Sequence, residues 1–394
     1  MSTNVRLVTT NSKLKIAVLG TRGFPGVQGG VETHCENLYP VLVQQGCEVV
    51  VFARRPYVQY IRYVYKGVKL ISLPCPKHKF LESILHTLYG VFAAKRIAPD
   101  ILHIHAIGPS LIIPVARLLG LKVVMTNHGP DYQRMKWGKL AKLFLKLGEY
   151  AGSTWAHSII CISESIANFI REKYKRDVTV IPNGVILPEV LQTSNALIKY
   201  GLEKKKYILT VGRFVPEKGF HDLIDAFDQL LVSNTTILAE KWRLVIVGQA
   251  DHEDKYSVNL KAKASRNSNI ILTGFLKGEP LLELYSHAGL FVLPSYYEGL
   301  PIVLLEAMSY GLSCIVSDIP ANKNIELSIQ RFFRPGDIKS ITLKMEEFIK
   351  CPLSEEEGQK QRKMIAKKFS WEIIALKTME VYKSTLNEKC YEKE

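Results

Sequence analysis

The sequence has few cysteines, no long apolar run and no low-complexity tract. Its seven cysteines form no C-x-x-C pair, which argues against a disulfide framework or a zinc knuckle and fits a reducing, cytoplasmic environment. The most apolar stretch, Ile104 to Met125, contains Pro109, Pro114 and two cations, so no run of about 18 apolar residues remains to span a membrane. Residues 1–12 are polar and lack the apolar segment of a signal peptide, and we expect them to form a disordered tail.

Acidic residues are also in the minority, because 37 Asp and Glu face 52 Lys and Arg and the formal net charge is +15. Such an excess of positive charge indicates an anionic partner. No motif of a nucleic-acid-binding domain and no arginine stripe interleaved with aromatic residues is present, so we expect no nucleic acid. A substrate that carries phosphates, or an anionic membrane surface, explains a diffuse lysine excess.

Two glutamates lie in the most informative stretch, Gly289 to Asp318. Two apolar runs enclose a helical segment that begins at Pro301, which predicts two parallel strands joined by a right-handed crossover. Glu298 lies in the turn before this helix and Glu306 lies on the helix, at the end of the sheet where open α/β folds bind ligands. Free N–H groups at the helix start suit a diphosphate, which leaves the carboxylates for hydroxyls. Alternatively, each glutamate is a solvated cap that complements the helix dipole.

A glycine-rich turn follows the first predicted strand, residues 13–20, and ends with Gly29 and Gly30 directly before a predicted helix. The glycine spacing differs from the dinucleotide fingerprint, so no NAD site is expected. Adjacent glycines let a ligand approach backbone N–H groups closely. The alternative is a tight strand-to-helix turn without a ligand.

Three histidines lie in or after predicted strands. His103 and His105 point to one face of the strand at residues 100–105, which is compatible with a metal pair, but no third ligand is evident and we expect no metal. We expect His103 to be packed and His105 to lie near the ligand-binding edge. His128 follows the next strand in a loop, where a side chain with a near-neutral pKa suits a sugar hydroxyl or a leaving phosphate.

Two cations, Arg213 and Lys218, follow a further predicted strand in a loop that begins with Gly212. Paired cations at this end of a sheet can neutralise a diphosphate leaving group, although single exposed cations normally serve only solubility. Gly248 occupies the ligand-side turn after the next strand. Because the cations replace a metal and no Asp-x-Asp motif occurs, we predict neither metal nor cofactor.

A basic amphipathic segment covers Trp137 to Tyr150. Its apolar side chains share one helical face and its lysines share the other. Such a helix either lies on an anionic membrane or packs on its own core, and both interpretations stay open.

These motifs together resemble those of the retaining glycosyltransferases of family 4. The stretch with Glu298 and Glu306 is similar to the E-x7-E signature, residues 212–219 (GRFVPEKG) are similar to the motif G-R-x-x-x-x-K-G, and residues 20–40 resemble a bacterial subgroup linked to surface polysaccharide and rhamnosyl transfer. The resemblance implies an α/β fold of the GT-B type, in which two facing Rossmann-like, doubly wound parallel-sheet domains enclose an interdomain cleft.

The expected organisation is a tail (1–12), an N-terminal acceptor-side domain (13–187), a linker (188–200) and a nucleotide-sugar-binding domain (201–360). A C-terminal helix (361–394) is expected to pack back on the first domain, as the resemblance implies.

The resemblance also implies which residues form the site. Glu298 is expected to contact the transferred sugar and Glu306 the ribose hydroxyls. The expected catalytic residues are Glu298, His128, Arg213 and Lys218. The expected donor contacts are Gly29, Gly30, Gly212, Arg213, Lys218, Gly248, Glu298, Gly299, Leu300 and Glu306, and the expected acceptor-side residues are Glu32, His105 and Asp131.

The predicted function is metal-independent, retaining transfer of a sugar from a nucleotide-diphosphate donor to a hydroxyl of a lipid-linked saccharide in bacterial surface polysaccharide assembly. The expected location is the cytoplasm, with peripheral contact to the anionic inner face of the cell membrane as an option. Two alternatives stay open. One is a sugar-nucleotide epimerase or phosphorylase of the same architecture, and the other is a non-catalytic basic protein that binds the membrane surface.

Overall fold

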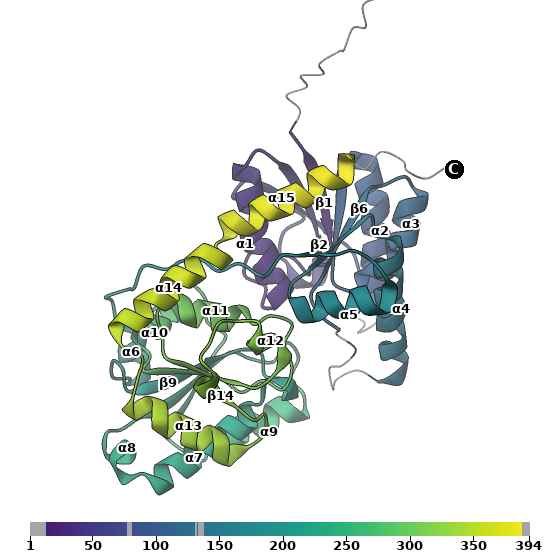
Figure 1. Ribbon diagram of the computed structural model, residues 1–394. Coiled ribbons are helices and arrows are strands. Elements are labelled where there is room, and N and C mark those ends of the chain that lie inside the picture. Colours follow the sequence, from purple (N-terminus) through teal and green to yellow (C-terminus); the bar gives the residue numbers. More distant parts are fainter. Residues whose placement is uncertain (1–12, 77–80, 131, 133–137, 388–394) are drawn as a thin grey trace, which may run out of the picture.

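The computed structural model describes residues 13–76, 81–130, 132 and 138–387, which form two α/β domains (Figure 1). The first sheet has eight strands in the order β3-β4-β2-β1-β5-β6-β7-β8, and the second has six in the order β11-β10-β9-β12-β13-β14. Among the described strands all neighbours are parallel except β3 and β4, which form an antiparallel edge. The predicted class, two doubly wound parallel-sheet domains, is confirmed.

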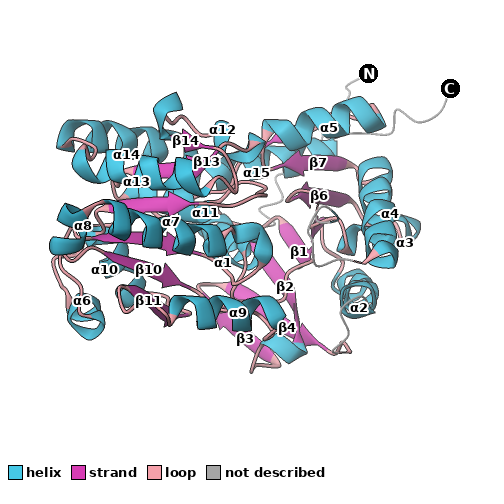
Figure 2. Ribbon diagram, turned by 90° about the horizontal axis from the view of Figure 1, so that it is seen from below, coloured by secondary structure: helices cyan, strands magenta, loops and turns pink. Residues whose placement is uncertain are grey.

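The strands are short and apolar. They are β1 (Lys15–Leu19), β2 (Glu48–Arg54), β3 (Arg62–Tyr65), β4 (Val68–Leu73), β5 (Ile101–His105), β6 (Val123–Asn127), β7 (Ser158–Cys161), β8 (Thr179–Val180), β9 (Tyr207–Val211), β10 (Arg243–Val247), β11 (Ile270–Gly274), β12 (Leu290–Leu293), β13 (Cys314–Ser317) and β14 (Phe332–Phe333). All five residues of β5 and of β6 are buried. Continuous burial of this kind is expected because helices cover both faces of a parallel sheet, as Figure 2 shows.

The helices of the first domain are α1 (Gly30–Gln44), α2 (Leu81–Ile97), α3 (Ile113–Leu118), α4 (Lys139–Trp155) and α5 (Glu164–Tyr174). Those of the second are α6 (Asn195–Tyr200), α7 (Phe220–Ser233), α8 (Thr235–Ala239), α9 (Lys255–Ala264), α10 (Glu279–His287), α11 (Ile302–Ser309), α12 (Pro320–Lys323) and α13 (Ile338–Lys350). Part of the predicted linker is therefore helical, because α6 covers residues 195–200. The backbone N–H of Ala196 near its start donates to Glu283 of α10 at 2.6 Å, which ties α6 to the second domain.

The C-terminal region forms two helices, α14 (Glu355–Phe369) and α15 (Trp371–Asn387), where we expected one from residue 361. Helix α14 packs on α11 of the second domain, and α15 packs on α1 of the first (Figure 1). The helix is interrupted between them at Ser370. There the carbonyl of Phe369 accepts a hydrogen bond from the N–H of Val185 at 2.7 Å, where the chain passes from one domain to the other. The predicted tail, residues 1–12, lies outside the described residues.

The strand order of each sheet reverses once beside a central strand. Strand β1 lies between β2 and β5, and β9 lies between β10 and β12. In open parallel sheets the loops at the carboxyl ends of such strand pairs diverge and leave room for a ligand. The two reversals therefore mark where a site is expected in each domain.

Candidate active site

Three of the residues predicted to hold the donor, Arg213, Lys218 and Glu298, follow β9 and β12, and β9 lies at the reversal of the second sheet beside β12. Arg213 and Lys218 lie in the turn after β9, and Glu298 lies in the loop between β12 and α11. The two turns are in close contact, because a Cβ added at Gly219 would lie 2.2 Å from the carbonyl oxygen of Pro294. They meet where open α/β sheets bind ligands.

Lys218 and Glu298 are in direct contact. The Nζ atom of Lys218 lies 2.5 Å from Oε1 of Glu298, and the two side chains are 17% and 11% exposed. The hydroxyl of Ser295 donates to the same oxygen at 2.7 Å. The lysine and the glutamate neutralise each other, and Lys218 and Ser295 both contact the same carboxylate oxygen, Oε1.

Arg213 is paired with a residue that the sequence motifs did not indicate. Its Nη1 atom lies 2.8 Å from Oδ2 of Asp251, and the same oxygen lies 3.4 Å from Nη1 of Arg22 in the first domain. Arg22 also pairs with Glu32 of α1 at 3.2 Å. Burial opposes ionisation of Glu32, but Arg22 outweighs burial and lowers the pKa of that carboxyl. A chain of alternating charges therefore joins α1 to Arg213 across the two domains.

Glu306 lies on α11, whose other residues are mostly apolar and buried. It accepts a hydrogen bond from the hydroxyl of Tyr285 at 2.9 Å. Burial raises the pKa of the Glu306 carboxyl, and the Tyr285 hydrogen bond offsets only part of that rise. Tyr310 stacks on Tyr285 with ring centroids 5.4 Å apart. Among the described residues no cation offsets the burial of the Glu306 carboxyl. A buried carboxylate with a purely structural role normally has such a partner.

The turn after Glu298 packs against the first domain. A Cβ added at Gly299 would lie 2.4 Å from the carbonyl oxygen of His128, so this glycine allows the two loops to touch. The next residue, Leu300, accepts a hydrogen bond through its carbonyl from Nδ2 of Asn183 at 3.0 Å. His128 is therefore a neighbour of the loop between β12 and α11, residues 294–301, which we call the donor loop.

The predicted glycines have different environments. Gly29 has φ of 150°, and a Cβ there would lie 2.1 Å from Oε2 of Glu32, whereas Gly30 has no atom within 4 Å of an added Cβ. Gly30 is open to a ligand. At Gly248 an added Cβ would lie 1.8 Å from the carbonyl oxygen of Gly212, so Gly248 allows the turns after β9 and β10 to pack backbone to backbone, whereas a Cβ at Gly212 would lie 3.2 Å from the ring of Phe220.

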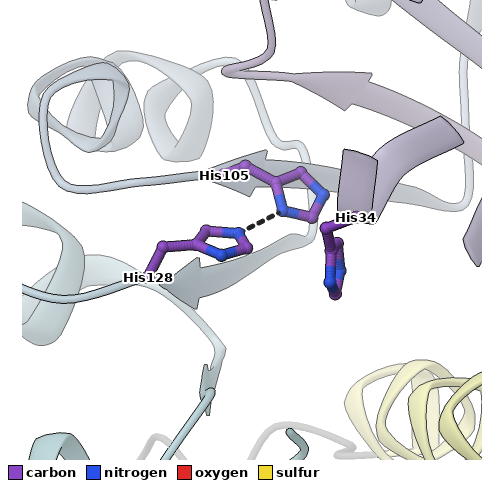
Figure 3. A group of neighbouring side chains, drawn as sticks. All are labelled: His34, His105 and His128. Carbon is purple, nitrogen blue, oxygen red and sulfur yellow. Dashed lines mark hydrogen bonds between the residues drawn. The ribbon is translucent and has the colours of Figure 1, made fainter. Parts of the chain in front are cut away.

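Histidines from three elements lie together at the reversal of the first sheet. Nδ1 of His105, at the end of β5, lies 3.0 Å from Nε2 of His128 (Figure 3). His34 of α1, which the motifs did not indicate, lies with its ring centroid 5.1 Å from that of His128. One nitrogen of each of the three rings lies within 4.8 Å of the others. The group contains His105 but not His103, so it is not the pair that the strand at residues 100–105 suggested.

His103 is packed, as we expected. It is fully buried, and its Nε2 lies 2.7 Å from the hydroxyl of Thr126. Its Nδ1 lies 2.7 Å from the hydroxyl of Tyr382 on α15. This histidine joins the sheet to the C-terminal helix.

The basic amphipathic segment forms α4, which starts at residue 139. Its apolar side chains Leu140, Leu143, Phe144, Leu147 and Tyr150 are 66, 53, 39, 45 and 55% exposed. They form an outward-facing row, which we call the α4 stripe, in place of a face packed on the core. Within the described residues no helix is long and apolar enough to cross a membrane. Two predicted positions, Asp131 and Trp137, lie outside the described residues.

Known proteins with similar sequences and structures agree with this fold. Residues 195–370 match the family model of Glycosyl transferases group 1, and residues 28–187 match that of Glycosyltransferase Family 4. The chain is 31% identical over 254 residues to the UDP-Gal:alpha-D-GlcNAc-diphosphoundecaprenol alpha-1,3-galactosyltransferase of Escherichia coli. That alignment covers 62% of this chain and 63% of the relative, so it spans less than two thirds of the relative's length.

Two solved structures superpose on nearly the whole chain. Sucrose-phosphate synthase from Thermosynechococcus elongatus has a TM-score of 0.79 at 19% identity and covers 96% of this chain and 100% of its own. Anabaena Alr3699/HepE in complex with UDP-glucose has a TM-score of 0.76 at 16% identity and covers 94% and 100%. At these identities the likeness shows the fold alone, which is GT-B. Each of the two domains therefore matches a glycosyltransferase family model, and neither model alone covers half of the chain.

Proposed function

We propose that this protein transfers a sugar from a nucleotide-diphosphate donor to a hydroxyl group of a saccharide acceptor, with retention of the anomeric configuration. The observation that carries the proposal is the contact between Lys218 and Glu298 at the reversal of the second sheet, with Arg213 in the same turn. Cations and a carboxylate at this position suit a leaving diphosphate and a sugar hydroxyl, respectively.

The diphosphate is the group on which negative charge develops. When the bond from the anomeric carbon to the diphosphate oxygen breaks, its electron pair leaves with the oxygen. Arg213, Lys218 and the N–H groups at the start of α11 stabilise that charge, which lowers the barrier most if they interact more strongly with the transition state than with the substrate. In this reaction they replace a divalent metal at the diphosphate.

The two glutamates hold different parts of the donor. Glu298 binds a hydroxyl of the transferred sugar, and Glu306 binds the ribose hydroxyls as a carboxylate. Donor binding has to exchange partners, because Lys218 now pairs with Glu298 and Arg213 with Asp251. The released diphosphate receives the acceptor proton while the acceptor oxygen forms the new bond on the same face of the sugar. His128, next to Gly299, contacts the sugar, Gly29 and Gly30 contact the donor, and Glu32 and His105 line the acceptor side.

The acceptor class that we propose is a lipid-linked saccharide used in surface polysaccharide assembly. A relative is named for transfer to a sugar on diphosphoundecaprenol. The net charge of +15 suits an anionic diphosphate lipid or the membrane that carries it. We infer a location in the cytoplasm with peripheral contact to the inner face of the membrane.

The α4 stripe is the surface that would make this contact. Exposed apolar side chains lie beside Lys139 and Lys146, which are exposed as well, and this combination suits an anionic bilayer. We expect sedimentation with vesicles of phosphatidylglycerol, weakened by salt, and little with phosphatidylcholine. Replacing Leu143 and Leu147 by glutamate should abolish it. Leu376, 56% exposed on α15, provides the control, and equal loss in Leu376→Glu would contradict a specific role for α4.

The first experiment is a thermal-shift screen of UDP, GDP, dTDP and ADP sugars, because a ligand that binds only the folded state raises the melting temperature. The best donor is then incubated with and without a lipid-diphosphate saccharide, and nucleotide release and glycosylated product are measured. Acceptor-dependent product formation supports the proposal. Isomerisation of the donor without an acceptor would favour an epimerase instead, and membrane binding with no response to any nucleotide sugar would favour the non-catalytic alternative.

A further inference from the structure

The three histidines His34, His105 and His128 come from three separate elements and converge at the end of the first sheet. Figure 3 shows the rings of His105 and His128 joined by their hydrogen bond, with His34 beside them. One nitrogen of each ring lies within 4.8 Å of one nitrogen of each of the other two. His34 and His105 are buried, and His128 is half-buried. Three neutral imidazole rings can pack together without a bound ion. Three convergent imidazoles are also a typical set of ligands for a transition metal.

One ring nitrogen of His34 and one of His105 have partners outside the cluster. Nδ1 of His34 lies 3.0 Å from Oδ1 of Asn183. The orientation of that amide is set by its other end, where Nδ2 donates to the carbonyl of Leu300. Nδ1 of His34 is therefore the donor, and its Nε2 keeps the lone pair.

His105 is held in the same way. Its Nε2 lies 2.5 Å from the hydroxyl of Tyr39, which is fully buried. Outer partners of this kind fix the ring orientation of metal-binding histidines, with the distal N–H donating to an oxygen. A metal ion bound between His105 and His128 displaces the proton that now joins their two nitrogens. That proton can move to Nε2 of His105, whose N–H then donates a hydrogen bond to the hydroxyl oxygen of Tyr39.

We propose that His34, His105 and His128 form a binding site for one divalent transition-metal ion of the zinc class, with the fourth coordination position left to water or a ligand. Zinc–nitrogen bonds of about 2.0–2.1 Å place two tetrahedral ligand nitrogens roughly 3.3–3.5 Å apart. The His105 and His128 nitrogens, now 3.0 Å apart, need to separate by only a few tenths of an ångström. The nitrogens of the three rings lie within 4.8 Å of one another, so His34 completes the site by a movement of its ring of up to about 1.5 Å.

Occupancy of this site inhibits sugar transfer, an effect that rests on the proposed function of His128. A metal on Nε2 of His128 removes that nitrogen from the sugar. The metal also binds His34, which is linked through Asn183 to the carbonyl of Leu300 in the donor loop. The proposed transfer itself uses no metal, so a chelator should leave activity unchanged or raise it, whereas zinc should lower it.

The test is a titration of the full chain, without a histidine tag, with Co²⁺, whose visible absorption reports ligand number, followed by displacement with Zn²⁺. We expect one ion per chain at micromolar concentration. His34→Gln should weaken binding at least tenfold, and Tyr39→Phe, which removes an outer partner, about tenfold. His252→Gln replaces an exposed histidine and should have no effect. A cooperative thermal unfolding transition near the wild-type temperature verifies that each variant is folded.

Absence of stoichiometric Co²⁺ binding, or equal binding by His34→Gln and the wild type, overturns the site. Binding without inhibition of transfer overturns the inhibitory role and retains the site. Because the cobalt spectrum does not depend on catalysis, a protein that binds Co²⁺ but transfers no sugar contradicts the proposed function and leaves the metal site standing.

Discussion

Arg22 of the first domain and Arg213 of the second share one carboxylate oxygen, Oδ2 of Asp251. The cation assigned to the donor diphosphate is therefore already neutralised before the donor binds, and the same contact joins the two domains. Donor binding has to replace this carboxylate with phosphate oxygens. The strength of the Asp251 contact thus sets part of the donor affinity.

Asp251→Asn should accordingly tighten binding of the nucleoside diphosphate. The pair is only about one fifth exposed, and a partly exposed ion pair contributes roughly 0.5–1 kcal/mol, so we expect a decrease in Kd of about two- to fivefold. Isothermal titration calorimetry at two salt concentrations measures it. Glu253→Gln is the matched control, because Glu253 lies in the same loop but pairs with Lys261. Weaker binding in Asp251→Asn would mean that this carboxylate contacts the donor directly.

Lys218→Ala and Glu298→Gln should each lower kcat by about 10²–10³-fold, which is typical when one group that stabilises a transition state is removed. The two variants should differ in the Kd for the donor. Lys218→Ala removes a phosphate contact and also leaves Glu298 facing the diphosphate, so its donor Kd should rise more. Activity close to wild type in either variant would contradict the assigned roles. Lys255→Ala, which changes an exposed lysine at the start of α9, should be neutral.

Local patterns in the sequence predicted the strand, turn and helix around Glu298 and the turn with Lys218, because apolar periodicity and glycine positions depend on near neighbours. That these two residues touch depends on strand order, which was expected only through the family resemblance. Asp251 and His34 were not predicted. Asp251 lies in a polar turn that looks like solvated surface, and its partner Arg22 is more than two hundred positions away in the chain. His34 lies four residues after Gly30 on a helix, where no local pattern distinguishes a ligand from a packed residue.

The predicted single C-terminal helix failed for a similar reason. The two helices meet at Ser370, whose hydroxyl accepts a hydrogen bond from the N–H of Ile373 at 3.4 Å at the start of α15. The carbonyl of Phe369 accepts a second hydrogen bond from the N–H of Val185, and this contact joins segments too distant in sequence for a local pattern to show.

Glu306→Gln should stabilise the ligand-free protein and weaken donor binding. Burial raises the pKa of the Glu306 carboxyl in the folded protein. The contribution of this carboxyl to the free energy of unfolding is therefore fully present below its pKa in the unfolded chain, and it is lost as the pH rises through its pKa in the folded protein. The glutamine amide does not ionise, so the variant loses no stability in this way. The melting temperature of the variant should therefore exceed that of the wild type increasingly as the pH rises from about 4.5 to 8.

Scanning calorimetry across this pH range, with and without the nucleotide sugar, separates the two effects. With the donor present the order should reverse, because a ribose contact with a carboxylate is stronger than one with an amide. Tyr285→Phe is the matched control for the other end of the 2.9 Å hydrogen bond, and it should destabilise the protein at high pH by removing a donor from the ionised carboxyl. A pH-independent difference between Glu306→Gln and the wild type would contradict the raised pKa.

Gly30 separates the two interpretations of the adjacent glycines. A Cβ added there meets no atom within 4 Å, and Gly30 is the first residue of α1, so Gly30→Ala should leave the melting temperature unchanged or slightly higher. If a ligand approaches this backbone, alanine should raise the KM for donor or acceptor several-fold, and Gly30→Leu should do so much more while the protein stays folded. Gly138→Ala, at the start of α4, has the same open surroundings and should change neither quantity. Wild-type kinetics in Gly30→Leu would mean that the pair serves only the turn, since a leucine at a ligand-contacting backbone position displaces the ligand by its volume alone.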